Sequence, residues 1–139
     1  MREERRQKVK QEQIKMLQTG NVHAWNKWRE THPKAAIDLR GVSFDGLLNV
    51  PGAELAGANL TKVTLSGANL TEANLSEAIL EMVELDVSQL FGAVLKKAKL
   101  NAADLRRAVA KYANFSQADL SKAIIVGADL EGALFREAV

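Results

Sequence analysis

The chain has 139 residues, 47% of them hydrophobic, and a formal net charge of +2. This length fits one domain with an apolar core, and no apolar run approaches the roughly 20 residues that a membrane span needs. Cysteine is absent and the N-terminus is charged, which excludes a disulfide framework and a secretory signal and leads us to expect a cytoplasmic protein.

Residues 1–34 have no repeat and are predicted to form a helical N-terminal cap. Strong helix formers predict a helix over 7–19, and Gly20 is a suitable end for it. Asn21 is placed to cap a second short helix that ends before Pro33. The apolar residues of the two helices are Val9, Ile14, Met16, Leu17, Val22, Trp25 and Trp28.

The charge of this segment differs from that of the remainder. Residues 1–34 hold nine Lys or Arg and four Asp or Glu, whereas 35–139 hold ten and thirteen. A basic start is compatible with binding to nucleic acid or anionic lipid, but Glu3, Glu4 and Glu12 are interleaved with the cations. We therefore interpret the first segment as a solvated helix.

From Leu55 to Phe135 an apolar residue stands at every fifth position, with a small residue two places before it. A period of five fits neither a helix, which repeats every 3.6 residues, nor a strand, which alternates every two. It fits a chain that points a small and a large side chain inward and then turns a corner. Repetition of this step predicts a solenoid whose stacked coils pair their backbones. Ser88 would bring a hydroxyl inside that needs a backbone partner.

The register begins less regularly. Leu39 and Phe44 are in step with each other, but Val50 comes one residue late. The intervening stretch, residues 45–52, is rich in turn formers. We expect a bulge or a widened corner there, without a break in the solenoid.

Several units, including Ala58–Lys62, Ala68–Glu72, Ala73–Glu77 and Ala118–Lys122, read alanine, asparagine or aspartate, leucine, and two variable residues. In this they resemble the pentapeptide-repeat family. The resemblance implies an all-β solenoid, a right-handed quadrilateral β-helix with four units per coil and about five coils over 35–139. The segment Trp25–Arg29 is similar to segments that precede the repeats in some family members, which implies a lid over the first coil.

Catalytic and metal-binding patterns are not evident. His23 and His32 have no carboxylate or nucleophile at a suitable spacing, and we interpret them as surface residues. The Asn and Asp residues of the repeats are spread over all sides, as turn chemistry requires. We therefore predict a protein that is not an enzyme and uses no cofactor or metal.

Function is then expected on the outer surface, where some apolar residues interrupt the polar pattern. The candidate interaction surface comprises Phe91, Val94, Ile79, Met82 and Val109. Phe91 is the foremost candidate because aromatic anchors dominate many interfaces, and packing against a neighbouring coil is the alternative role. The candidate C-terminal dimer end comprises Ile124, Val126, Leu134 and Phe135, where an apolar end is expected to pair with a second copy.

The leading hypothesis is a rigid scaffold that binds an as yet unidentified protein. The family resemblance also implies an alternative, a rod that imitates DNA and binds DNA gyrase or a related topoisomerase. That mechanism needs sustained negative potential, and a basic cluster from Lys96 to Lys111 interrupts it. A nucleic-acid site on this cluster is the weakest hypothesis, because Tyr112 is the one aromatic residue beside it.

Overall fold

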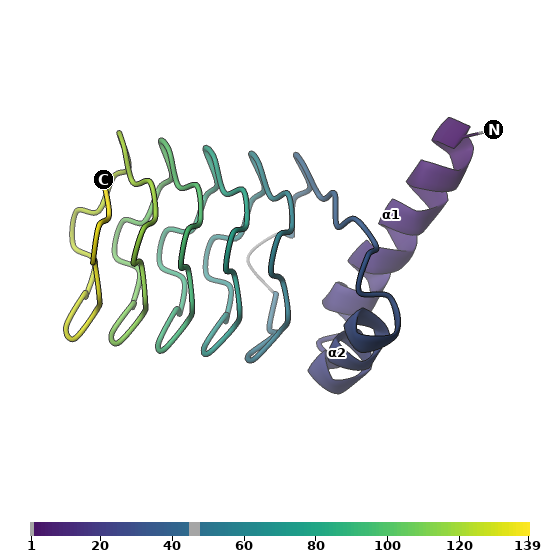
Figure 1. The fold of residues 1–139 in the computed structure, drawn as a ribbon, viewed down its shortest axis with the longest axis horizontal. Helices are drawn as coiled ribbons and strands as arrows, with labels where there is room; N and C mark the ends of the chain where they lie inside the picture. The colour runs from purple at the N-terminus through teal and green to yellow at the C-terminus, as the bar shows by residue number, and fades with distance from the viewer. Residues whose placement is uncertain (1, 45–47) are drawn as a thin grey trace.

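The fold is a stack of coils with two helices at its N-terminal end. A computed structural model describes residues 2–44 and 48–139. Figure 1 shows the coils following one another away from the helices, with the C-terminus at the far end of the stack. Each coil is built from short extended steps separated by turns, so the backbone pairs as isolated parallel bridges.

The two helices are α1, Arg2–Gln18, and α2, Val22–Thr31. Helix α1 begins five residues before the expected position, because its charged first turns are strong helix formers although they bury nothing. The predicted start of α2 is confirmed, since the Asn21 side chain accepts a hydrogen bond from the Ala24 N–H. Leu17 and Trp25 anchor the helices in the core, whereas Val9 is largely exposed.

The bridges define the register between coils. From Asn49 paired with Asn69 onward, each bridge joins residues 20 positions apart, whereas Asp38 pairs with Asn59 at a separation of 21. The extra residue noticed in the sequence therefore lies between Ser43 and Asn49. The bulge expected around residues 45–52 falls partly on 45–47, which lie outside the described residues.

The interior is formed by the two positions that the sequence pattern predicts. The leucines from Leu55 to Leu105 and the small residues between them are buried almost completely. Each leucine buried in this way contributes roughly 1.5–3 kcal/mol, and the small residues leave the room that a narrow interior requires. The Ser88 hydroxyl donates a hydrogen bond of 2.6 Å to the Leu85 carbonyl, so the expected backbone partner is present.

The corners are turns in which one residue has a left-handed conformation. After the central residue of each unit, the second residue has a positive φ, as at Lys62, Val87 and Tyr112. The carbonyl of the central residue accepts the N–H three residues on, for example from Ala53 to Val50. This is the arrangement of a type II turn, which glycine or asparagine usually satisfies. Glycine marks some of these corners, as at Gly57 and Gly67, but charged and apolar residues fill many of the others.

Val87 is the least suitable residue for such a corner, because a β-branched side chain is strained at its φ of 52°. Its side chain is exposed, so replacement removes little packing. We expect Val87→Asn to raise the free energy of unfolding by about 1 kcal/mol, measured by denaturant unfolding. Val109→Asn, at an exposed valine outside the left-handed corners, is the control and should not stabilise. Equal effects of both substitutions would contradict the assignment of strain.

Side chains of α2 satisfy the backbone edge of the first coil next to Glu54. The Asn26 side chain accepts the Glu54 N–H at 2.8 Å and donates to the Gly52 carbonyl at 3.0 Å. Trp25 Nε1 donates to the Glu54 carbonyl at 2.9 Å, and Arg29 donates to the carbonyls of Glu54 and Ala56. These side chains replace the hydrogen bonds that a preceding coil would supply.

The turn between the helices lies against another part of the same edge. Gly20 has a φ of +73°, and a Cβ there would lie 3.2 Å from the Asn49 carbonyl oxygen. Both the backbone conformation and the close approach therefore favour glycine at this position. The contact of α2 with Glu54 and the contact of Gly20 with Asn49 fix the cap against two adjoining sides of the first coil.

Asn26 tests this description of the cap. Asn26→Ala leaves the Glu54 N–H and the Gly52 carbonyl without their partner, and we expect a loss of about 1–3 kcal/mol in the free energy of unfolding. Thermal and denaturant unfolding measure it. Lys27→Ala, exposed on the same helix, is the matched control and should change stability by less than about 0.5 kcal/mol. An Asn26→Ala variant as stable as this control would contradict the role.

Candidate functional site

The bridge register divides the five candidate surface residues between two edges of the rod. Four turns separate residues 20 positions apart, so turns that lie two steps apart in the chain are on opposite edges. Met82 lies at one corner, with Ile79 on the face that precedes it. Phe91 and Gly92 form the corner two turns later, between the faces that carry Val109 and Val94. The candidates therefore do not form one surface.

The corner of Phe91 carries an aromatic pair. The Phe91 and Tyr112 rings meet edge to face, with their centroids 5.5 Å apart. Tyr112 lies at the same corner one coil later, and both rings are exposed, with 41% and 56% of their residue surfaces accessible. We call Phe91, Val94, Val109 and Tyr112 the aromatic edge. Phe91 thus packs against a neighbouring coil and is also accessible, so both roles considered for it are compatible.

The Tyr112 ring lies over Gly132, the residue at the same corner one coil further on. A Cβ at Gly132 would lie 2.5 Å from two carbon atoms of the Tyr112 ring, so the ring occupies the space that a side chain would fill. The adjacent Lys111 Nζ lies 3.5 Å from Asp129 Oδ2 and 3.4 Å from Glu131 Oε2, and these carboxylates raise the pKa of Lys111. The edge is therefore held in place on its C-terminal side by packing and by charge.

Tyr112 was not among the candidate surface residues that the sequence suggested. The signal that identifies it is the 20-residue register, which places position 112 at the corner of position 92. Val87 is a second exposed apolar residue outside the candidate surface. Both occupy the left-handed turn position, as does Met82, which the candidate surface does include.

The basic residues between positions 96 and 111 do not form one patch. Lys97, Arg107 and Tyr112 lie at three of the four corners of one coil, with Ala102 at the fourth, so the cations beside them are distributed around it. Arg106 is engaged by Asp104 through two hydrogen bonds of 2.9 and 2.6 Å, which lower the pKa of the Asp104 carboxyl. The cluster consists of Lys96, Lys97, Lys99, Arg106, Arg107 and Lys111.

The candidate C-terminal dimer end is exposed in the described chain. Val126 has 73% of its surface accessible, and Ile124 and Leu134 are also exposed. Phe135 stacks on Phe115 with centroids 5.1 Å apart and planes at 3°, but Phe115 is buried whereas Phe135 is 41% accessible. The apolar interior therefore continues into the last coil, where Phe135 is exposed in the described chain.

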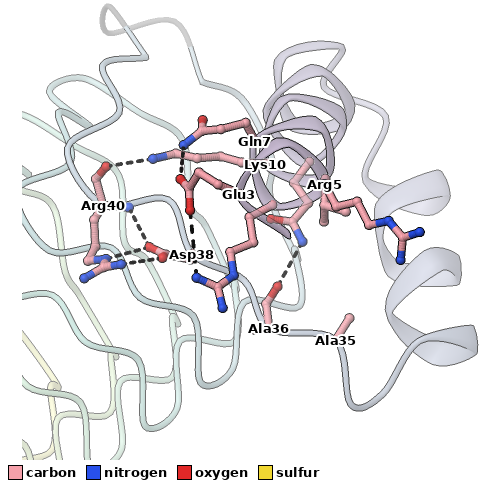
Figure 2. Close-up of a pocket in the computed structure, with 11 residues that line it drawn as sticks. Glu3, Arg5, Gln7, Lys10, Ala35, Ala36, Asp38 and Arg40 are labelled. Atoms are coloured by element: carbon pink, nitrogen blue, oxygen red, sulfur yellow. Dashed lines mark hydrogen bonds and ion pairs between the residues drawn. The ribbon is translucent and has the colours of Figure 1, made fainter. Parts of the chain in front are cut away.

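An open groove of about 590 Å³ lies at the other end of the rod, between α1 and the first coil. Figure 2 shows Glu3, Gln7 and Lys10 of α1 facing Asp38 and Arg40 across it. Arg40 binds Asp38 through two hydrogen bonds of 2.8 and 2.7 Å, which lower the pKa of the Asp38 carboxyl. We call this the cap groove; the full lining is Glu3, Arg5, Arg6, Gln7, Val9, Lys10, Gln13, Ala35, Ala36, Asp38 and Arg40.

The two histidines are on the cap. His32 stacks on Trp28, and its Nδ1 lies 2.9 Å from the Thr31 hydroxyl and 3.0 Å from the Trp28 carbonyl. Within residues 2–44 and 48–139, no three His, Cys, Asp or Glu side chains are grouped so that they could hold a metal ion. The repeat Asn and Asp side chains act in turns, as when Asn59 accepts hydrogen bonds from the Thr61 N–H and hydroxyl.

A family model described as pentapeptide repeats matches the chain in 8 copies, over residues 52–86, 88–125 and 113–139. The chain belongs to the pentapeptide-repeat family. Its neighbours among solved structures are pentapeptide-repeat proteins, which imply a right-handed β-helix solenoid for the stacked coils. No curated protein sequence matches the chain significantly.

Three solved pentapeptide-repeat structures illustrate the similarity. Rfr23, from the cyanobacterium Cyanothece 51142, is 26% identical, with 74% of this chain and 87% of Rfr23 covered and a TM-score of 0.65. HetL, involved in heterocyst differentiation regulation in Nostoc sp. strain PCC 7120, is 28% identical over 73% of this chain and 60% of its own, with a TM-score of 0.31. A trypsin-treated form of QnrB1, a plasmid-mediated fluoroquinolone resistance protein, is 19% identical over 74% and 70%, with a TM-score of 0.39.

The helices of this pentapeptide-repeat protein are short or polar. Of the helices in the described part of the chain, none has the length and apolar character that crossing a membrane requires. Helix α1 has 17 residues, with charged side chains along most of its length.

Proposed function

We propose that this pentapeptide-repeat protein is a non-enzymatic scaffold that binds another protein through the aromatic edge. In this proposal residues 1–34 act as a cap and residues 35–139 form a rod of about five coils. The observation that carries it is the exposed pair Phe91 and Tyr112, framed by Val94 and Val109. Exposed aromatic rings with fixed positions supply large contact area at low entropic cost, which is typical of residues that dominate interfaces.

The rigidity of the rod supports this function. The aromatic edge is carried by coils whose backbones are hydrogen-bonded to both neighbours, as at Leu90, which donates to the Val109 carbonyl at 2.6 Å. Tyr112 is further held by its contact with Gly132. A partner therefore meets a surface that is already ordered, and binding need not fix these rings at a further entropic cost.

The DNA-mimic alternative is less well supported by the distribution of charge. Every charged side chain from Glu72 to Asp86 is acidic. From Lys96 to Lys111, every charged side chain except Asp104 is basic. A protein that imitates the DNA duplex in order to bind a topoisomerase needs negative charge along its whole length. The sign of the charge changes between adjacent coils, so this requirement is not met. We therefore rank a protein partner other than a topoisomerase first.

Capture of the partner from the native cell tests the aromatic edge. We expect Phe91→Ser combined with Tyr112→Ser to weaken capture of the protein bound by the wild type by at least tenfold, because truncated aromatic anchors commonly cost 2 kcal/mol or more. Met82→Ser, on the opposite edge and similarly exposed, is the matched control and should retain the partner. Melting temperatures establish that the variants are folded. Retention by the double variant, or equal loss in the control, would exclude this edge.

We also propose that two copies pair through the C-terminal end formed by Ile124, Val126, Leu134 and Phe135. The exposure of these apolar side chains supports the proposal, since large exposed apolar patches commonly mark interfaces. Sedimentation at increasing concentration should show a dimer that Leu134→Glu converts to a monomer. Gln89→Glu, exposed on a central coil, should leave the dimer intact. A wild-type monomer at all concentrations would refute this pairing.

A further inference from the structure

The cap groove lies over a part of the first coil in which some backbone groups have no hydrogen-bond partner among the described residues. Beside Glu54, in contrast, the cap supplies these partners. In the rod, three groups of each step point toward the preceding coil, as shown by Asn74, whose N–H donates to Ala53 and whose carbonyl accepts from Leu55. The third is the carbonyl two residues on, at Ser76, which accepts from Gly57. These three groups are the ones through which each step hydrogen-bonds to the coil before it.

Beside Glu54 the cap supplies all three partners, through Asn26, Trp25 and Arg29. The corresponding groups on the neighbouring face are the N–H and carbonyl of Asp38 and the carbonyl of Arg40. Lys10 Nζ donates to the Arg40 carbonyl at 3.2 Å. Among residues 2–44 and 48–139, no group hydrogen-bonds to the Asp38 N–H or carbonyl, so this edge has an open pairing position.

The open position borders the cap groove. Asp38 and Arg40 line the groove from the coil, and Val9, Lys10 and Gln13 line it from α1. Gln13 Nε2 donates to the Ala36 carbonyl at 3.0 Å, which fixes the helix beside the edge. The volume of about 590 Å³ is in the range of sites that accept ligands, and a strand added to an open edge is a common form of peptide recognition.

The charge of the groove indicates the chemistry of the added strand. Its two carboxylates are already engaged, Glu3 by Arg6 at 3.9 Å and Asp38 by Arg40. Lys10 has a backbone carbonyl as its partner, and Arg5 contributes a further cation to the lining. The net charge of the lining is therefore positive, and the cations not bound to a carboxylate favour acidic side chains.

We propose that the cap groove binds an extended acidic segment of a partner protein, which pairs in parallel at the open position of Asp38. One of its carbonyls accepts the Asp38 N–H, one of its N–H groups donates to the Asp38 carbonyl, and its acidic side chains lie near Lys10 and Arg5. The segment thereby occupies the position that a preceding coil would take. This site is separate from the aromatic edge, and neither depends on the other.

A nuclear magnetic resonance titration of the full chain tests the site with two synthetic eight-residue peptides, one of alternating valine and glutamate and one of alternating valine and lysine. We expect the acidic peptide to shift the Asp38 amide resonance and to slow its hydrogen exchange at least tenfold, because a new hydrogen bond protects that N–H. The Asn74 amide, already bonded to Ala53, should not change. No effect at Asp38, or equal binding of both peptides, would overturn the proposal.

Charge reversal identifies the groove as the binding position. Lys10→Glu should weaken binding of the acidic peptide at least tenfold, whereas Lys97→Glu, exposed at a corner of a central coil, should leave it within about twofold. The exchange of the Asp38 amide in the unliganded protein provides an independent measurement, and we expect it to be faster than that of Asn74. Protection of Asp38 without peptide, or equal effects of both substitutions, would refute an open pairing position.

Discussion

The hydrogen bonds between successive coils are the constraint on which the rest of this molecule depends. Each step of the chain, such as that around Asn74, uses one set of backbone groups for the coil before it and another for the coil after it. A coil without a neighbour therefore exposes a row of polar groups whose burial without partners is costly. This explains why Trp25, Asn26 and Arg29 direct polar side-chain atoms at the backbone near Glu54, and why the neighbouring face at Asp38 offers a place for a further strand.

Much of the rod was predictable from the sequence, because its interior repeats one physical requirement. A large residue at Leu75 and a small one at Ala73 have the same surroundings in every coil, so the spacing alone identifies the buried positions. The start of α1 was placed too late, because the first turns are held by helix propensity without a buried face. The left-handed corners were not predicted either: glycines such as Gly57 and Gly67 signal some of them, but residues such as Val87 give no local signal of positive φ.

The surface was less predictable, because neighbours on the rod are separated by 20 positions in the chain. Phe91 was recognised as an outward aromatic residue, but its contact with Tyr112 depends on how adjacent coils align. The same alignment separates Ile79 and Met82 from Phe91, although all three are close in sequence. The cap groove arises from the angle at which α1 meets the first coil, and nothing in the spacing of Lys10 and Arg40 indicates that angle.

The constant register sets a fixed spacing between equivalent corners along the rod. Adjacent coils are about 4.8 Å apart, and the 20-residue repeat returns each corner to the same side. Insertion or loss of one coil between the cap and Phe91 would therefore move the aromatic edge along the axis by that distance without turning it. A chain with this geometry can vary in evolution the separation between two bound molecules in fixed steps while their relative orientation stays the same.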